Sequence, residues 1–143
     1  ASLGTNTRFL NPIPYTTLTI PSTASKAITV GAYDSNRQTY ADFSGRGFTR
    51  ETNQIKPDIV APGSRIVSLA AGSSYQAKSG TSMSTPIVAG CIALLLEKYP
   101  DLTNREIKLH LRNTALDLGY SHTRQGWGLI QCDRMLSTPP TRL

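Results

Sequence analysis

Three short runs of apolar, often β-branched residues predict strands in the first half of the chain. They are Ala27–Tyr33, Asp58–Ala61 and Arg65–Ala70, and turn-forming residues follow each of them. The first run alternates only partly between apolar and polar positions, which is typical of a strand buried in a sheet. The segment up to about Ser25 contains three prolines and many hydroxyl side chains. Such a composition favours extended and turn conformations at the surface.

The pattern changes after Gly80, where apolar residues recur on nearly every face of a helix that runs to Tyr99. A helix that is hydrophobic all round is usually a buried helix, so this one is expected at the centre of the molecule. Pro86 is expected in its first turn, where the missing N–H has no intrahelical partner to lose. Pro100 marks its end.

A second helix is predicted from Thr103 to Leu118. Thr103 and Glu106 are three residues apart and form a capping-box pair at its start, and Gly119 suits its C-terminal cap. The helix has one apolar stripe and a basic outer face. It is therefore expected at the surface.

Strands followed by helices predict an α/β architecture, with residues 1–143 as a single domain or part of one. The charged stretch Thr49–Gln54 is expected to be a solvent-exposed loop. Gly126–Ile130 is expected to form a tight turn and a short extended piece, ahead of a helical stub over Asp133–Leu136. Residues 137–143 are expected to be a loose tail.

A net charge of +6 raises the question of a nucleic-acid partner, because basic patches attract phosphate. Most lysines and arginines are scattered singly, and one loose cluster gathers on and before the second helix: Lys98, Arg105, Lys108 and Arg112. A basic outer face on a surface helix is commonly only solvated, so we expect no nucleic-acid partner. The longest apolar run, Ile87–Leu96, is shorter than the roughly 18 to 20 residues of a membrane span, and no span is predicted.

The two cysteines are too few for a disulfide framework, and their spacing does not match a metal site. Cys91 lies inside the apolar helical run and is interpreted as a small core residue. Cys132 can be equally inert. The sequence does not decide whether the two form a disulfide, and it leaves the redox compartment of the protein undecided.

The segment Ser79–Pro86 passes from a glycine turn directly into the first helix, which puts Ser82 at a helix N-terminus. Unpaired N–H groups and the helix dipole stabilise negative charge there, so the segment has the outline of an oxyanion site. A serine nucleophile also needs a general base, normally a histidine oriented by a carboxylate. His110 and His122 have no orienting acid nearby in the sequence and are interpreted as structural or solvent-exposed residues rather than bases. By itself, a serine at this place is more often an N-cap than a nucleophile.

The longer sequence around Ser82 favours its interpretation as a nucleophile. The stretch Gly80–Gly90, GTSMSTPIVAG, resembles the serine motif of the subtilisin-like, or subtilase, family of serine peptidases. Other segments resemble that family's neighbouring motifs in the same order and spacing: Ala27–Ala32, Lys56–Gly63, Tyr99–Thr103 and Gly126–Ile130. The resemblance extends from about Pro21 to Leu136, and so many linked motifs make coincidence improbable.

The resemblance implies the C-terminal part of a three-layer domain with a mostly parallel sheet and a buried central helix. It implies that Ser82 attacks the scissile carbonyl to give an acyl-enzyme and that its own N–H helps to hold the oxyanion. Gly80, Thr81 and Met83 would support the site, and no catalytic metal is implied. The family's catalytic Asp and His precede the serine along the chain, so both are expected upstream of Ala1.

The family's second oxyanion donor is an asparagine that is also expected upstream, which leaves Asn6 and Asn11 as loop residues. The chain by itself is therefore expected to be hydrolytically inactive, with the upstream half of the same domain as its partner. The leading hypothesis is a serine endopeptidase that acts on protein or peptide substrates. The alternatives are a catalytically dead subtilisin-like pseudoenzyme retained for protein binding and, with less support, a basic binding module.

The resemblance implies no cofactor for the hydrolysis itself. Several family members bind a structural calcium or sodium ion through carbonyls of the loop that corresponds to Ser22–Ala27, near an acid aligned with Asp58. The sequence leaves open whether a cation binds at this loop. The alternative is that local backbone N–H groups satisfy Asp58 without an ion. Family habit favours a secreted or cell-envelope location.

Overall fold

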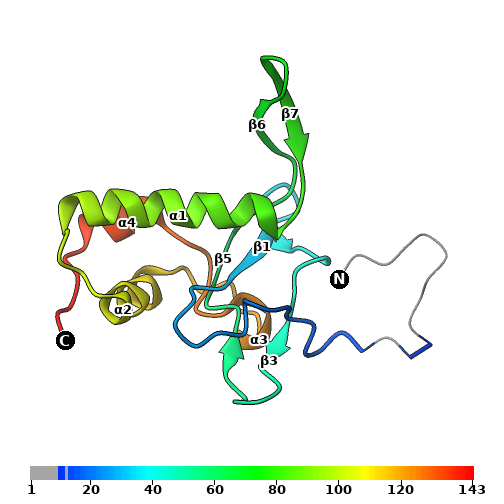
Figure 1. Cartoon of the computed structure of the whole chain (residues 1–143), viewed down its shortest axis with the longest axis horizontal. Helices are drawn as coiled ribbons and strands as arrows, with labels where there is room; N and C mark the ends of the chain where they lie inside the picture. The colour runs from blue at the N-terminus through cyan, green and yellow to red at the C-terminus, as the bar shows by residue number, and fades with distance from the viewer. Residues whose placement is uncertain (1–9, 12) are drawn as a thin grey trace.

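The computed structural model describes residues 10–11 and 13–143 (Figure 1). Asn6, one of the two asparagines expected in loops, lies outside the described residues. The strands are β1 (Val30–Asp34), β2 (Thr39–Tyr40), β3 (Gly47–Phe48), β4 (Ile55–Lys56), β5 (Ile59–Pro62), β6 (Ile66–Ala70) and β7 (Ser74–Lys78). The helices are α1 (Thr81–Lys98), α2 (Asn104–Thr114), α3 (His122–Gln125) and α4 (Cys132–Ser137).

The central sheet has the strand order β2-β1-β5. β1 and β5 pair in parallel, with Val30 opposite Ile59, whereas β2 joins β1 antiparallel. Beyond β5, Leu129 continues the sheet through a parallel bridge to Val60. The predicted α/β class is confirmed. The sheet is mixed rather than mostly parallel within the described residues, because β2 follows β1 through a tight turn that only antiparallel strands can share.

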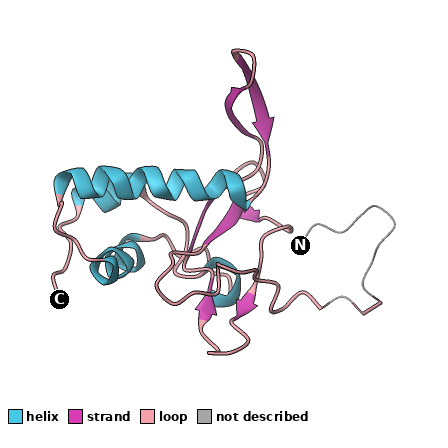
Figure 2. Cartoon of the chain, in the orientation of Figure 1, coloured by secondary structure: helices cyan, strands magenta, loops and turns pink. Residues whose placement is uncertain are grey.

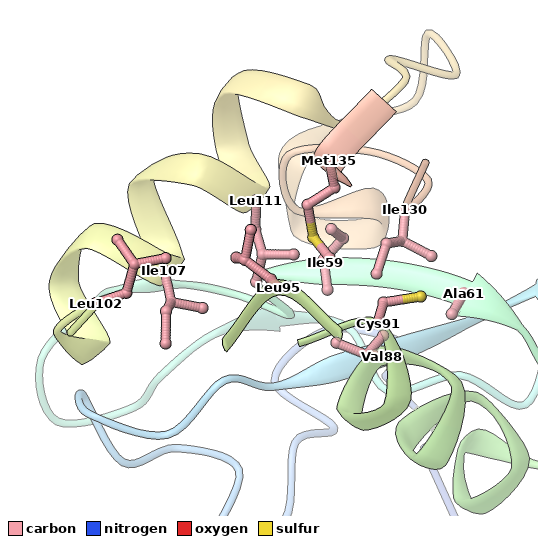
Figure 3. Packing of buried hydrophobic residues seen from close by; sticks show 10 residues of the cluster. All are labelled: Ile59, Ala61, Val88, Cys91, Leu95, Leu102, Ile107, Leu111, Ile130 and Met135. Carbon is pink, nitrogen blue, oxygen red and sulfur yellow. The ribbon is translucent and has the colours of Figure 1, made fainter. Parts of the chain in front are cut away.

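Both faces of β5 are buried. Ile59 and Ala61 pack against the apolar side of α1, in a cluster that also draws on α2 and α4 (Figure 3). Val60, between them, packs on the opposite face with Tyr33 and Tyr40. Alternate side chains of a strand point to opposite faces, so an apolar residue at every position is what such a strand requires.

α1 is buried on one face only, contrary to the expectation of a helix buried all round. Its buried residues are Ser84, Val88, Cys91 and Leu95, which repeat at the helical period and face the sheet. On the opposite side Ala89, Gly90, Ala93 and Leu94 are exposed. In residues 10–11 and 13–143, the helix has a sheet on one side and nothing that covers the other (Figures 1 and 2).

Two hairpins are only partly predictable from the sequence. The charged stretch Thr49–Gln54 is the tip of the β3–β4 hairpin. Residues 50–54 are exposed as expected, whereas Thr49 is buried, at 4% exposed. The two short strands of this hairpin are not visible in the polar sequence. β7 is absent from the predicted elements, because its residues SYQAK are mostly polar; it pairs antiparallel with β6. The β6–β7 hairpin projects from the body of the molecule, and Val67, Leu69 and Tyr75 on it are exposed.

The second helix has the predicted start and an earlier end. The Thr103–Glu106 capping box is present at the start of α2. The helix ends at Thr114 instead of Leu118, and Ala115 is its C-terminal cap. The chain leaves the helix there because Leu116 pairs antiparallel with Leu129, a long-range contact that overrides local helix propensity. Gly119 lies in the turn that follows, at a φ of 77°.

The C-terminal segment has the predicted turn after Gly126, the extended piece around Leu129 and the helical stub, which is α4. The short helix α3, just before the turn, is not among the predicted elements. The last residues have no regular structure, although Ser137 still belongs to α4. The backbone N–H of Leu143 donates a 3.1 Å hydrogen bond to Oε1 of Glu106, which brings the end of the chain to the start of α2.

Candidate active site

The turn ahead of α1 depends on glycine at two positions. Gly80 is the N-cap residue, with φ 153° and ψ 161°, a conformation that side chains strongly disfavour. Its N–H donates to the Gly63 carbonyl over 2.8 Å, which fastens the turn to the end of β5. A Cβ on Gly63 would lie 2.8 Å from the Cβ of Ala32 and 3.0 Å from the Gly80 carbonyl oxygen. Only glycine lets the two turns come this close.

Ser84 holds the first turn of the helix against the sheet. Its side chain is fully buried, and its hydroxyl donates a 3.0 Å hydrogen bond to the carbonyl of Ala61 in β5. This bond fixes the rotation of α1 about its own axis. Because Ser82 is two residues away, roughly 200° around the helix, the same bond turns Ser82 away from the sheet.

Ser82 is the second residue of α1, so the predicted place at a helix N-terminus is confirmed. Its side chain is exposed. No side chain caps the helix, and its first turn contains no acidic residue. The N–H of Ser82 therefore has no intrahelical acceptor and lies at the positive end of an 18-residue helix. An anionic oxygen beside Ser82 would be stabilised by this end.

Pro86 is not in the first turn, contrary to the prediction from the sequence, because α1 begins at Thr81 and the proline is its sixth residue. Its missing N–H would have bonded the carbonyl of Ser82, four residues earlier. The proline therefore leaves that carbonyl without its helical donor. The effect is local, next to the serine.

The remaining predicted site residues are consecutive with Ser82 and lie with it. Met83 donates its backbone N–H to the Gly80 carbonyl over 3.0 Å, which closes the turn. A side chain on Gly80 would lie 3.7 Å from the Met83 sulfur, so the glycine keeps this side of the turn open. Thr81 lies at the edge of a cavity of about 730 Å³, whose wall also includes Asp42, Arg46 and Arg50.

The two histidines are engaged elsewhere, as expected of structural residues. His110 is buried in α2, and its Nε2 donates to the Met135 carbonyl over 2.7 Å. Nδ1 of His122 donates to the Gly126 carbonyl over 2.7 Å. Within residues 10–11 and 13–143, no hydrogen bond joins the Ser82 hydroxyl to a base.

At the Ser22–Ala27 loop, where the sequence leaves open whether a cation binds, lysine side chains donate to two of the carbonyl oxygens. Nζ of Lys56 donates to the Ala27 carbonyl over 2.8 Å and to Oδ2 of Asp58 over 2.6 Å. Nζ of Lys108 donates to the Ser25 carbonyl over 2.6 Å. The backbone N–H of Thr29 also donates to Oδ2 of Asp58, over 2.7 Å. The expected backbone partner of Asp58 is therefore present, together with two ammonium groups that the sequence did not reveal.

Two side chains of the basic cluster near α2 bond to other parts of the chain. Lys108 donates to the Ser25 carbonyl of the loop just described, and Lys98 donates to the Leu136 carbonyl over 2.9 Å. Two of its four side chains thus hold the structure together. Across the described part of the chain, no helix combines the length and the apolar character that crossing a membrane demands.

Both cysteines are free thiols. Cys91 is buried in the core cluster, and Cys132 packs against the same cluster. Burial raises the pKa of the Cys91 thiol to about 12, with a further contribution from the Cys132 side chain. Cys91 is thus the small core residue that the sequence predicts.

The comparisons with known proteins agree with this arrangement. The model of the subtilase family matches residues 5–128. The chain therefore belongs to the subtilase family of serine peptidases.

Individual relatives match over most of this chain. The serine protease AprX of Bacillus subtilis (strain 168) is 44% identical over 117 residues, which covers 68% of this chain and 26% of that protein. Subtilisin BL of Lederbergia lenta is 40% identical over 116 residues, which covers 81% of this chain and 40% of that protein. The solved structure of the Clostridium perfringens CspB protease superposes with a TM-score of 0.84 at 39% identity, covering 91% of this chain and 30% of that one. The chain thus spans less than half the length of these relatives.

Two supporting residues of the site are not recognisable at the sequence level. Gly63 and Ser84 each belong to a segment that resembles the family, yet nothing local shows that they meet. The available signal was the small size of both residues, since a small residue on the buried side of a helix often marks a close approach to its neighbour.

Proposed function

We propose that the protein containing this chain is a serine endopeptidase in which Ser82 is the nucleophile. The observation that carries the proposal is the exposed Ser82 at the uncapped N-terminus of α1, held in place by Ser84 and Gly80. Attack of Oγ on a peptide carbonyl, with the hydroxyl proton passing to a general base, would give a tetrahedral oxyanion. Cleavage of the C–N bond would then release the protonated amine and leave an acyl-enzyme. The developing oxyanion would lie near the free N–H of Ser82, where hydrogen bonding and the helix dipole act together.

The general base and its orienting carboxylate would come from a region that precedes Ala1 in the full-length protein. Two observations support this. His110 and His122 are bonded to backbone carbonyls, and the relatives that match are two and a half to four times as long as the stretch that this chain covers in them. The exposed side of α1, around Ala89, Ala93 and Leu94, offers the apolar surface on which such a region can pack.

The cavity that Thr81 helps to line has room for a segment of a peptide. Its volume of about 730 Å³ falls within the usual range for ligand sites. One relative, from Natrialba magadii, is named a halolysin-like extracellular serine protease. Its name supports a location outside the cell for this protein as well.

A fluorophosphonate probe tests the proposal, because it labels only a serine that a base has activated. The full-length protein should be labelled, and Ser82→Ala should abolish the labelling. Ser137→Ala, which removes an exposed hydroxyl at the end of α4, is the matched control and should label like wild type. The chain of 143 residues by itself should not be labelled.

A folded, fully processed full-length protein that does not react would contradict the peptidase proposal. Peptide binding without labelling would then favour a pseudoenzyme that retains the fold for binding. Labelling that survives Ser82→Ala would place the nucleophile elsewhere.

A further inference from the structure

Three carbonyl oxygens of the loop Ser22–Ala27 accept hydrogen bonds from side chains of the protein itself. The Ser22 carbonyl accepts from the Thr29 hydroxyl over 2.6 Å. The Ser25 carbonyl accepts from Lys108 and the Ala27 carbonyl from Lys56. A calcium or sodium ion binds through such oxygens and would compete with these donors.

The charge of the cluster also opposes a cation. Asp58 is the carboxylate at this loop, and its side chain is 7% exposed. It faces two ammonium groups: Nζ of Lys56 at 2.6 Å and Nζ of Lys108 at 3.8 Å, with those side chains 2% and 17% exposed. The sum over the three groups is one excess positive charge. Repulsion between charges grows as water is excluded, so a metal ion added here would be strongly disfavoured.

The two lysines link the loop to neighbouring elements, as a bound ion would. Lys56 comes from β4 and Lys108 from α2, and both reach the same loop. An ammonium group has three donors that point in different directions, so one Nζ can join a carbonyl to a carboxylate. The loop, the start of β5 and α2 are thereby tied together through Asp58.

We propose that Lys56 and Lys108 take the place of a structural cation at the Ser22–Ala27 loop, so that this loop is held without calcium or sodium. The inference concerns stability and does not depend on whether Ser82 is catalytically active. Its experiment therefore uses the inactive Ser82→Ala form of the full-length protein, which also prevents self-digestion.

Bound calcium is counted by equilibrium dialysis, and the unfolding midpoint is followed by calorimetry in potassium, sodium and calcium salts at constant ionic strength. Asp58→Asn removes the carboxylate of the cluster and keeps an oxygen for the Thr29 N–H. It should bind as many calcium ions as the parent, and its midpoint should respond to sodium and calcium as the parent's does. A loss of one bound ion, or of the response, would overturn the proposal.

Lys56→Glu is the complementary variant, because it removes one ammonium group and supplies a second carboxylate beside Asp58. It should bind one more calcium ion per chain than the parent, and calcium should raise its midpoint more. Lys98→Met, which removes an ammonium group outside the cluster, is the control and should bind as the parent does. If Lys56→Glu folds and gains no ion, the ammonium is not what excludes the cation, and the proposal fails. If Lys56→Glu does not fold, Asp58→Asn decides alone.

Discussion

The buried hydroxyl of Ser84 donates a 3.0 Å hydrogen bond to the carbonyl of Ala61, and this bond joins the first turn of α1 to β5. The N–H of Gly80 makes a second tie, to the carbonyl of Gly63 just past the same strand. Ser82 lies between these two ties along the chain. The nucleophile that we propose is therefore held by the sheet through its neighbours, while its own side chain stays free and exposed.

Ser84→Ala should lower the free energy of unfolding by about 1 kcal/mol, the usual net value of one hydrogen bond. It should also slow fluorophosphonate labelling of Ser82, because the first turn of α1 loses one of its ties. Chemical unfolding and the labelling rate measure the two effects. Thr85→Ala is the matched control: its hydroxyl bonds within the helix, to the Thr81 carbonyl, and is exposed. An equal effect of the two substitutions would show that the Ser84–Ala61 bond has no special role.

Leu94→Ala tests whether an upstream region covers the open side of α1. The Leu94 side chain is 49% exposed in this chain, and truncating such a residue normally changes stability by no more than about 0.5 kcal/mol. In the full-length protein we expect a loss of about 2 to 5 kcal/mol, the cost of removing a buried leucine side chain. Leu143→Ala, at the exposed end of the chain, should have little effect. A small loss for Leu94→Ala as well would mean that this side of α1 faces solvent in the complete protein.

Glu106 should make stability fall in acid. Its carboxylate accepts hydrogen bonds from the backbone N–H and the hydroxyl of Thr103 and from the N–H of Leu143. These bonds, first among them the one from the Thr103 backbone, lower the pKa of Glu106 from 4.5 to about 2. A lowered pKa gives stability that is present above pH 4.5 and is lost as the pH falls toward 2.

Glu106→Gln keeps an oxygen acceptor for the capping box and cannot titrate. Its unfolding free energy should therefore fall less than that of wild type between pH 4.5 and pH 2, as measured by urea unfolding at a series of pH values. Glu97→Gln, which removes an exposed carboxylate of α1, controls for the change in net charge. Parallel pH profiles for wild type and Glu106→Gln would contradict this role.

Cys91 should resist alkylation in the folded protein. The thiolate is the reactive form, and burial raises the Cys91 pKa from 9.0 to about 12. Mass spectrometry after iodoacetamide treatment at pH 9 should find Cys91 unmodified in the native state and modified after denaturation. Cys132→Ser serves as a background that removes the second thiol. The raised pKa also means that stability falls as the pH rises from 9 toward 12, because the unfolded thiol ionises first.

The sequence determined the elements whose signals are local. The apolar stretch Asp58–Ala61, the glycine before Ser82 and the Thr103–Glu106 capping box each act within a few residues, and the structure has the predicted strand, helix start and cap. The motif Gly80–Gly90 also determined the family. These features depend on backbone propensity and on turn chemistry, which need no distant partner.

The tertiary structure decided what depends on contacts across the fold. α2 ends at Thr114 because Leu116 pairs with Leu129, and the polar strand β7 exists because β6 lies beside it. Ser84 supports the site only because the fold places the Ala61 carbonyl of β5 within hydrogen-bond distance of its hydroxyl. The largest change concerns Lys56 and Lys108: the sequence shows two ordinary basic residues, and the fold brings both to the carbonyls of one loop and to Asp58. Their role follows from their distances to these groups and from the burial of their side chains. Neither can be read from the spacing of residues along the chain.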